Sequence, residues 1–188
     1  MELSVRIAAV MCLLSAPALA QHETHGGGPL SVAQVGAVDF QTSCTTAVKA
    51  DFNSAVAQLH SFWFPEARKA FEGILAKDPN CAMAQWGVAL TYWGNPFAGL
   101  RTPQVIATGK AAIEKAQATG TPTRREKGYI DAVAGLFSSD DVTTQRARIV
   151  AYETTMGQVA VCATARAQKI RASMSPGLSF ATWPIVVS

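Results

Sequence analysis

The sequence predicts an all-α protein of about six helices that pack as consecutive antiparallel hairpins. Apolar residues recur every three or four positions in six stretches between Thr46 and Gln158, which is the period of an amphipathic helix. Short segments rich in Gly, Pro, Thr and Asp separate these stretches, and such segments end and begin helices. A length of 188 residues suits a single domain.

Residues 1–20 have the features of a signal peptide. Arg6 supplies positive charge, an apolar run follows from Ile7 to Leu14, and Ala18-Leu19-Ala20 presents the small residues expected of a cleavage site. We therefore expect a periplasmic or secreted protein. No later segment is apolar over enough residues to cross a bilayer, so we expect no membrane span after cleavage.

Residues 21–45 are predicted to form a flexible leader rich in His and Gly, followed by an arm. Gly26 to Pro29 disfavour regular structure. Val38 and Phe40 are apolar residues of the arm, and we expect them to pack on the first hairpin. Cys44 and Cys81 are the natural disulfide pair in an oxidising compartment, and two buried thiols are an equally weighted alternative.

The first hairpin is predicted to begin near Thr46, with an apolar stripe from Val48 to Phe62 on its first helix. Pro65 suits the first turn of the second helix, because the N–H that it lacks would have no partner there. Asp78-Pro79 is expected to end the second helix, since Pro disfavours helical geometry in the residue before it.

A third helix is predicted from Ala82 to Trp93, and Gly94-Asn95-Pro96 ends it. Gly87 lies in the middle of this helix, where glycine costs about 1 kcal/mol relative to alanine. We expect a neighbouring helix to approach closely at that position.

Three further helices are predicted from capping residues and helical period. Thr102 precedes a proline and caps the fourth helix. Thr123 and Glu126 have the spacing of a capping box at the start of the fifth helix. Asp140 and Asp141 are interpreted as capping acids for a sixth helix that starts near Val142.

Residues 159–188 are predicted to form an irregular tail. They contain no acidic residue and lose the helical period after the first turns. Two explanations are open: a disordered tail, or a segment read in a shifted frame. From Gln21 to Gln158 the acidic and basic residues balance, so the net charge of +3 comes from the tail. This distribution argues against a nucleic-acid partner, which requires a basic face on the folded domain.

The second and third helices carry a repeat signature. Ala67, Phe71, Ile74 and Pro79 have the spacing Ala-x3-Phe-x2-Ile-x4-Pro, which is typical of the second helix of a tetratricopeptide unit. Trp86-Gly87 stand where the next unit usually has a Leu-Gly pair. We therefore expect the hairpins of residues 46–158 to stack as a tetratricopeptide-like α-solenoid.

Four segments extend this likeness to a family: LHSFWF at residues 59–64, DPNCAMA at 78–84, Trp86-Gly87, and WGNPF at 93–97. In these segments the chain resembles a family of secreted bacterial tetratricopeptide-repeat proteins, over about Gln21 to Gln158. Members are generally longer, so the resemblance implies that this chain is an N-terminal fragment. The family carries no established activity that could be transferred.

Four residues are candidates for a binding site. By analogy with tetratricopeptide geometry, the first helix of each unit lines a concave groove, where His60 and Tyr92 would be neighbours. Tyr92, Trp93 and Phe97 lie next to a loop and are candidates for the rim of a pocket that anchors a peptide. The alternative reading places the aromatic residues in the core and makes His60 a partly buried histidine with one hydrogen bond.

A weaker hypothesis concerns metal binding. His22 and His25 flank Glu23, and after signal cleavage His22 would be the second residue of the chain, a position that permits copper or nickel chelation. A solvated leader is the favoured interpretation of these residues.

The sequence contains no catalytic or phosphate-binding motif, so we expect no enzymatic activity and no cofactor. The predicted function is an exported scaffold that binds a protein or peptide partner through a helical groove. Periplasmic copper binding through the leader histidines and His60 is the alternative.

Overall fold

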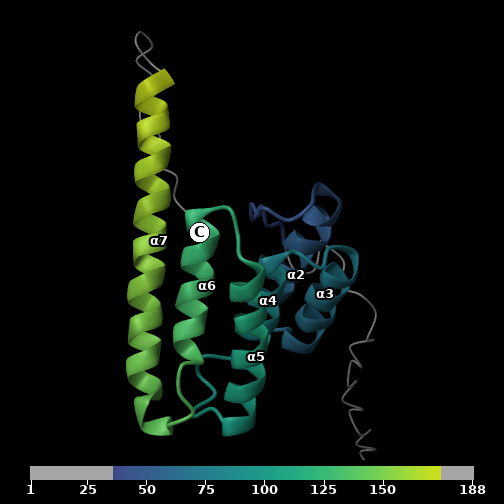
Figure 1. Ribbon diagram of the computed structural model, residues 1–188, viewed down its shortest axis with the longest axis vertical. Coiled ribbons are helices and arrows are strands. Elements are labelled where there is room, and N and C mark those ends of the chain that lie inside the picture. Colours follow the sequence, from purple (N-terminus) through teal and green to yellow (C-terminus); the bar gives the residue numbers. More distant parts are fainter. Residues whose placement is uncertain (1–35, 175–188) are drawn as a thin grey trace, which may run out of the picture.

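The computed structural model describes residues 36–174, which are helical apart from their turns and the segment before the first helix (Figure 1). The elements in chain order are η1 (Thr46–Val48), α2 (Lys49–His60), α3 (Phe64–Lys77), α4 (Ala82–Trp93), α5 (Pro103–Thr119), α6 (Arg124–Leu136), η2 (Val142–Thr144) and α7 (Gln145–Met174). The described part of the chain has no strand, so the prediction of an all-α protein with six helices is confirmed.

The helix starts follow the capping residues read from the sequence. The Thr102 hydroxyl accepts a hydrogen bond from the Val105 N–H at 3.3 Å at the start of α5. The Thr123 hydroxyl accepts one from the Glu126 N–H at 3.1 Å at the start of α6. Asp141 accepts one from the Thr143 N–H at 2.9 Å before η2. Each cap satisfies an N–H that has no partner within its own helix.

Each α-helix packs against the one that follows it, and α4 also contacts α2 and α6. In Figure 1 the helices follow one another across the molecule, from α2 and α3 at one side to α7 at the other. The hairpins α2–α3, α4–α5 and α6–α7 therefore place their first helices, α2, α4 and α6, next to one another.

The repeat-signature residues of α3 form its buried face. Ala67, Phe71 and Ile74 are almost fully buried, and Pro79 lies exposed just after the helix. Ala67, Phe71 and Ile74 belong to one apolar core that extends from η1 to the end of α6. Phe52 of α2 and Phe71 of α3 meet edge to face within it, with ring centroids 5.6 Å apart.

Gly87 allows α3 and α4 to approach closely, as predicted from its place in the middle of the helix. A Cβ atom at Gly87 would lie 2.4 Å from Cζ of Phe71, closer than carbon atoms can approach. A Cβ atom at Gly109 of α5 would likewise lie 2.1 Å from Cε1 of Phe137. In both cases the absent side chain makes room for a buried phenylalanine ring.

The prediction of an irregular tail from residue 159 is wrong for residues 159–174, because α7 continues to Met174. Val159 is buried, and a Cβ atom at Gly128 of α6 would lie 2.5 Å from its Cγ2. The segment lacks an apolar period but is rich in Ala and also contains Arg, Lys and Gln, all of which favour helix by intrinsic propensity. Residues 175–188 lie outside the described residues.

None of the helices in the part of the chain that the structure describes combines the length and apolar character needed to cross a membrane.

Candidate functional site

The segment Val38–Cys44, here called the arm, crosses the first helices of all three hairpins. The arm has no regular secondary structure, and its side chains alternate between half-buried and exposed. The half-buried residues are Val38, Phe40, Thr42 and Cys44, and the exposed ones are Asp39, Gln41 and Ser43. An alternation of period two indicates an extended chain lying with one side on a surface.

Phe40 anchors the arm through three aromatic rings, one from each of the helices it crosses. Its ring centroid lies 5.8 Å from that of Phe52 of α2, 5.8 Å from that of Trp86 of α4 and 5.3 Å from that of Tyr129 of α6. The guanidinium carbon of Arg125 lies 5.4 Å from the same centroid, within the range of a cation–π contact.

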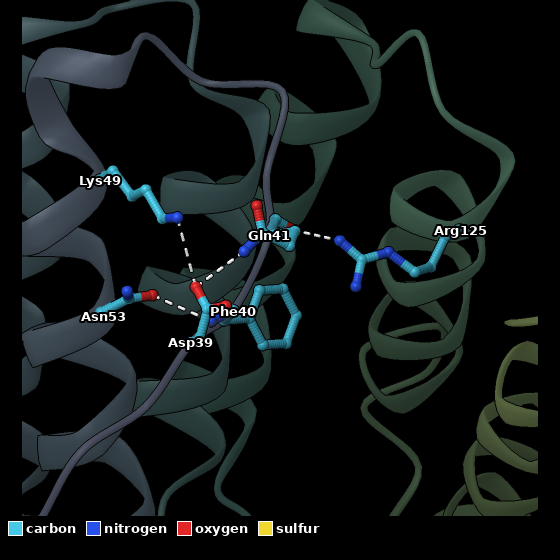
Figure 2. Close-up of polar contacts among 6 residues, drawn as sticks. All are labelled: Asp39, Phe40, Gln41, Lys49, Asn53 and Arg125. Carbon is cyan, nitrogen blue, oxygen red and sulfur yellow. Dashed lines mark hydrogen bonds and ion pairs between the residues drawn. The ribbon is translucent and has the colours of Figure 1, made fainter. Parts of the chain in front are cut away.

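Side chains of α2 and α6 bind the backbone of the arm from opposite sides (Figure 2). The Phe40 N–H donates to Oδ1 of Asn53 at 3.0 Å, and Nη2 of Arg125 donates to the Gln41 carbonyl oxygen. The Asp39 carboxylate pairs with Lys49 at 3.3 Å. We call the set that contacts the arm the arm-bearing face: Lys49, Phe52, Asn53, Trp86, Arg125, Glu126 and Tyr129.

Glu126 is fully buried at the end of this face. Its carboxylate accepts hydrogen bonds from the Ser43 N–H at 2.5 Å, from the Thr123 hydroxyl at 2.8 Å and from the Thr121 hydroxyl. Burial raises the pKa of this carboxyl, and the hydrogen bonds together lower it by more. The pKa of Glu126 therefore lies below its ordinary value, and the group is ionised at neutral pH.

A disulfide fixes the end of the arm. Cys44 and Cys81 are bonded, with their Cα atoms 4.8 Å apart, and Cys81 immediately precedes α4. The next residue is held as well, because the Thr45 N–H donates to Oδ2 of Asp78 at 2.8 Å. The last residues of the arm are thus attached both covalently and by hydrogen bonds.

Asp78 lies beside this disulfide, and its carboxylate and the two sulfur atoms lie within 4.8 Å of one another. Among the described residues this is the only cluster with the residue types and spacing of a metal site. Cysteine binds metals as a thiolate, and the disulfide leaves no thiolate here. His60 is not part of the cluster, and His22 and His25 lie outside the described residues.

The indole N–H of Trp86, which lies under the arm, is a buried hydrogen-bond donor that the arm does not satisfy. Trp86 is buried, and its Nε1 has no hydrogen-bond partner among the described residues. A buried indole N–H without an acceptor costs free energy, because it has lost its hydrogen bond to water. Phe40 therefore covers the indole ring without satisfying its polar atom.

The four residues predicted to form a groove have different environments. His60 is exposed at the end of α2. Tyr92 is half-buried under the guanidinium of Arg68, 4.1 Å from its ring centroid, and borders a shallow cleft of about 250 Å³ between α3, α4 and α5. Trp93 follows Tyr92 directly and projects in another direction, since successive helical residues are about 100° apart.

Trp93 is a core residue rather than part of a rim. It is 6% exposed and meets Phe137 edge to face, with centroids 5.5 Å apart. The guanidinium groups of Arg101 and Arg148 lie 5.0 and 5.9 Å from its ring centroid. Trp93 therefore lies in the core, as the alternative interpretation of the aromatic residues expects.

Phe97 lies in the loop between α4 and α5 and is 86% exposed. The loop is held by Arg101, whose guanidinium donates to the carbonyl oxygens of Trp93, Asn95 and Gly99. Gln145 donates to the Gly99 carbonyl at 2.9 Å and accepts from the Arg101 N–H at 2.7 Å. Phe97 thus projects from a loop with fixed carbonyl groups and lies apart from the arm.

The contacts of Asn53, Arg125 and Glu126 with the arm were not predicted. The sequence predicts only a capping role for Glu126, and Ser43, which donates its N–H to the Glu126 carboxylate, lies 83 positions earlier in the chain. From a single sequence, a polar helix residue that binds another segment cannot be distinguished from one that faces solvent. The usable signal was the isolated aromatic residue Phe40, expected to pack on the first hairpin, which in fact packs on all three hairpins.

Comparisons with models of known protein families, with curated proteins and with solved structures give no significant match. The tetratricopeptide assignment therefore stays a prediction from residue spacing.

Proposed function

We propose that this protein is a tetratricopeptide-like binding module whose arm-bearing face holds an extended segment of a partner protein. The observation that carries the proposal is the arm itself, which lies extended across α2, α4 and α6 and contacts all three. In the repeat family that the sequence resembles, the first helices of successive units line the concave surface. In this chain, α2, α4 and α6 are the first helices of the three hairpins.

The chemistry of the face supports peptide binding. Asn53 accepts from a backbone N–H and Arg125 donates to a backbone carbonyl group, so each recognises a main-chain atom that every peptide has. The three aromatic rings around Phe40 supply an apolar site for one side chain. Backbone hydrogen bonds give affinity and the side-chain site gives selectivity, as in other modes of extended-peptide recognition.

We further propose that the protein acts outside the cytoplasm, in the periplasm or after secretion. Residues 1–20 have the pattern of a signal peptide. The disulfide between Cys44 and Cys81 belongs to the kind of bond that persists in oxidising compartments.

The test is a selection of random peptides on the full chain carrying Phe40→Ala, which removes the anchor of the arm. The expected ligands bind this variant and lose at least about tenfold in affinity when Asn53→Ala and Arg125→Ala are added, since a tenfold loss corresponds to about 1.4 kcal/mol of lost contacts. A matched control variant replaces the exposed Glu114 with Ala. If no selected peptide depends on Asn53 and Arg125, the proposed site is wrong.

A further inference from the structure

The contacts of the arm specify which ligand its face would accept. Phe40 lies among rings of α2, α4 and α6 with a guanidinium group above it, an environment that favours a flat aromatic side chain. An aliphatic side chain would fill part of this space but would lose the ring–ring and cation–π contacts.

The position before the aromatic residue has a preference of its own. Asp39 pairs with Lys49 at 3.3 Å, with both side chains more than half exposed. An exposed pair contributes little affinity, but a basic residue in this position would be repelled by Lys49. The face therefore favours an acidic residue directly before the aromatic one.

The direction and register of the ligand follow from the backbone contacts. The aromatic residue donates its N–H to Asn53, the next residue accepts from Arg125, and the third residue after the aromatic one donates its N–H to Glu126. These groups recognise main-chain atoms, so they would bind any extended segment that places an aromatic residue in the ring site.

The arm occupies this site incompletely. Its residues are half-buried or exposed, and the Trp86 indole N–H below Phe40 has no acceptor among the residues that the structure describes. The covalent attachment at Cys44 keeps the arm at high effective concentration near the face. The arm can therefore compete with a ligand even if its own intrinsic affinity for the face is low. The disulfide attaches the arm at Cys44 only, so it does not itself prevent residues 38–43 from leaving the face.

We propose that the arm-bearing face selects an extended partner segment in which an aromatic residue directly follows an acidic one, and that Asp39-Phe40 occupies the face as an intramolecular competitor. This inference rests on the proposed function. It adds the class of ligand and states that the arm occupies the arm-bearing face when no ligand is bound.

The test supplies the arm in trans. An end-capped peptide of sequence GAVDFQTS, residues 36–43, is titrated into the full chain by calorimetry. It is expected to bind the Phe40→Ala chain at least tenfold more tightly than the unmodified chain, whose own arm competes. Phe40→Ala in the peptide should reduce affinity at least tenfold, while Phe40→Trp should retain binding. Asp39→Lys in the peptide should weaken binding less, and salt should reduce the difference.

The outcomes separate this inference from the proposed function. Equal affinity for both chains, or no binding to a folded Phe40→Ala chain, overturns the inference. If the random-peptide selection still yields ligands that need Asn53 and Arg125 but contain no aromatic residue, the proposed function stands and only the ligand class is wrong.

Folding of the variants is checked by far-ultraviolet circular dichroism. A Phe40→Leu chain serves as the second variant, because it retains apolar bulk and loses the ring contacts. If both Phe40→Ala and Phe40→Leu chains fail to fold, Phe40 is part of the obligatory core and the arm is not a displaceable competitor, which also overturns the inference.

Discussion

Glu126 joins the arm to α6 through a buried charge. The carboxylate accepts from one backbone N–H and two hydroxyl groups, which lowers its pKa despite burial. The spacing from Thr123 predicted a capping box, and the Thr123 hydroxyl does cap the Glu126 N–H. The contact with Ser43 could not be predicted, because local spacing holds no information about a segment so far away in the chain.

The Glu126→Gln variant should be less stable by about 1–3 kcal/mol at pH 7, because an NH2 group replaces one of two buried oxygens that both accept hydrogen bonds. The measurement is urea unfolding. Glu114→Gln is the matched control, since Glu114 is exposed and its pairing with Lys110 at 3.8 Å is weak. Equal stability of the two variants would show that the buried carboxylate contributes nothing specific.

The same group makes stability depend on pH. Because the pKa of Glu126 is lower in the folded chain, its contribution is complete above the unfolded-chain value of about 4.3 and is lost as the pH falls through the lowered value. Urea unfolding between neutral and acidic pH should therefore show a steeper loss of stability for the unmodified chain than for Glu126→Gln. Parallel pH profiles would contradict this assignment.

At the scale of elements, the close contact between α3 and α4 depends on Gly87. A Gly87→Ala change gains about 1 kcal/mol of helix propensity but forces the Phe71 ring to move, so we expect a net loss of about 1–3 kcal/mol in unfolding free energy. Gly73→Ala in α3 is the control, since a Cβ atom there meets nothing within 4 Å, and it should stabilise the protein. Two stabilising changes would contradict the packing at Gly87.

The helices themselves were largely predictable, because apolar period and capping residues are local signals. The end of α7 was not, since Val159–Met174 forms a helix without an amphipathic pattern. There the intrinsic propensity of the many Ala residues favours the helix, and a search for apolar period misses it.

This extension of α7 can be tested by two substitutions two residues apart. Val159→Asp places a charge against Gly128 and should destabilise the protein by about 1–3 kcal/mol. Val161→Asp, at a site that is 68% exposed, should change stability by less than about 0.5 kcal/mol. Thermal unfolding measures both, and equal effects would mean that α7 does not pack on α6 at Val159.

At the scale of the whole molecule, the Cys44–Cys81 disulfide links the arm to α4 and closes a long loop of the chain. Reduction should lower the unfolding free energy by about 2–4 kcal/mol. A Cys44→Ser/Cys81→Ser chain should have this lower stability already and should not respond to the reductant. If the reductant lowers the unfolding free energy of both chains equally, the loss does not come from the Cys44–Cys81 disulfide.

The predicted binding site illustrates what packing adds to sequence. Six helices and one aromatic residue in the arm were visible in the sequence, but the face that binds the arm combines residues from three separate helices. The nearby loop and the tetratricopeptide analogy place Tyr92 and Trp93 in one candidate site, yet the two side chains lie on different sides of α4. Which sides face one another depends on how the helices pack, and helical period alone does not determine this.

The loop that carries Phe97 affects how readily a protease can cleave the protein. A protease that cleaves after aromatic residues finds Phe97 accessible, but it must draw the flanking backbone into an extended conformation. The guanidinium of Arg101 and the amide of Gln145 hold carbonyl groups on both sides of Phe97. Cleavage at this loop therefore requires these hydrogen bonds to open first, so the free energy of opening lowers the rate of cleavage at Phe97.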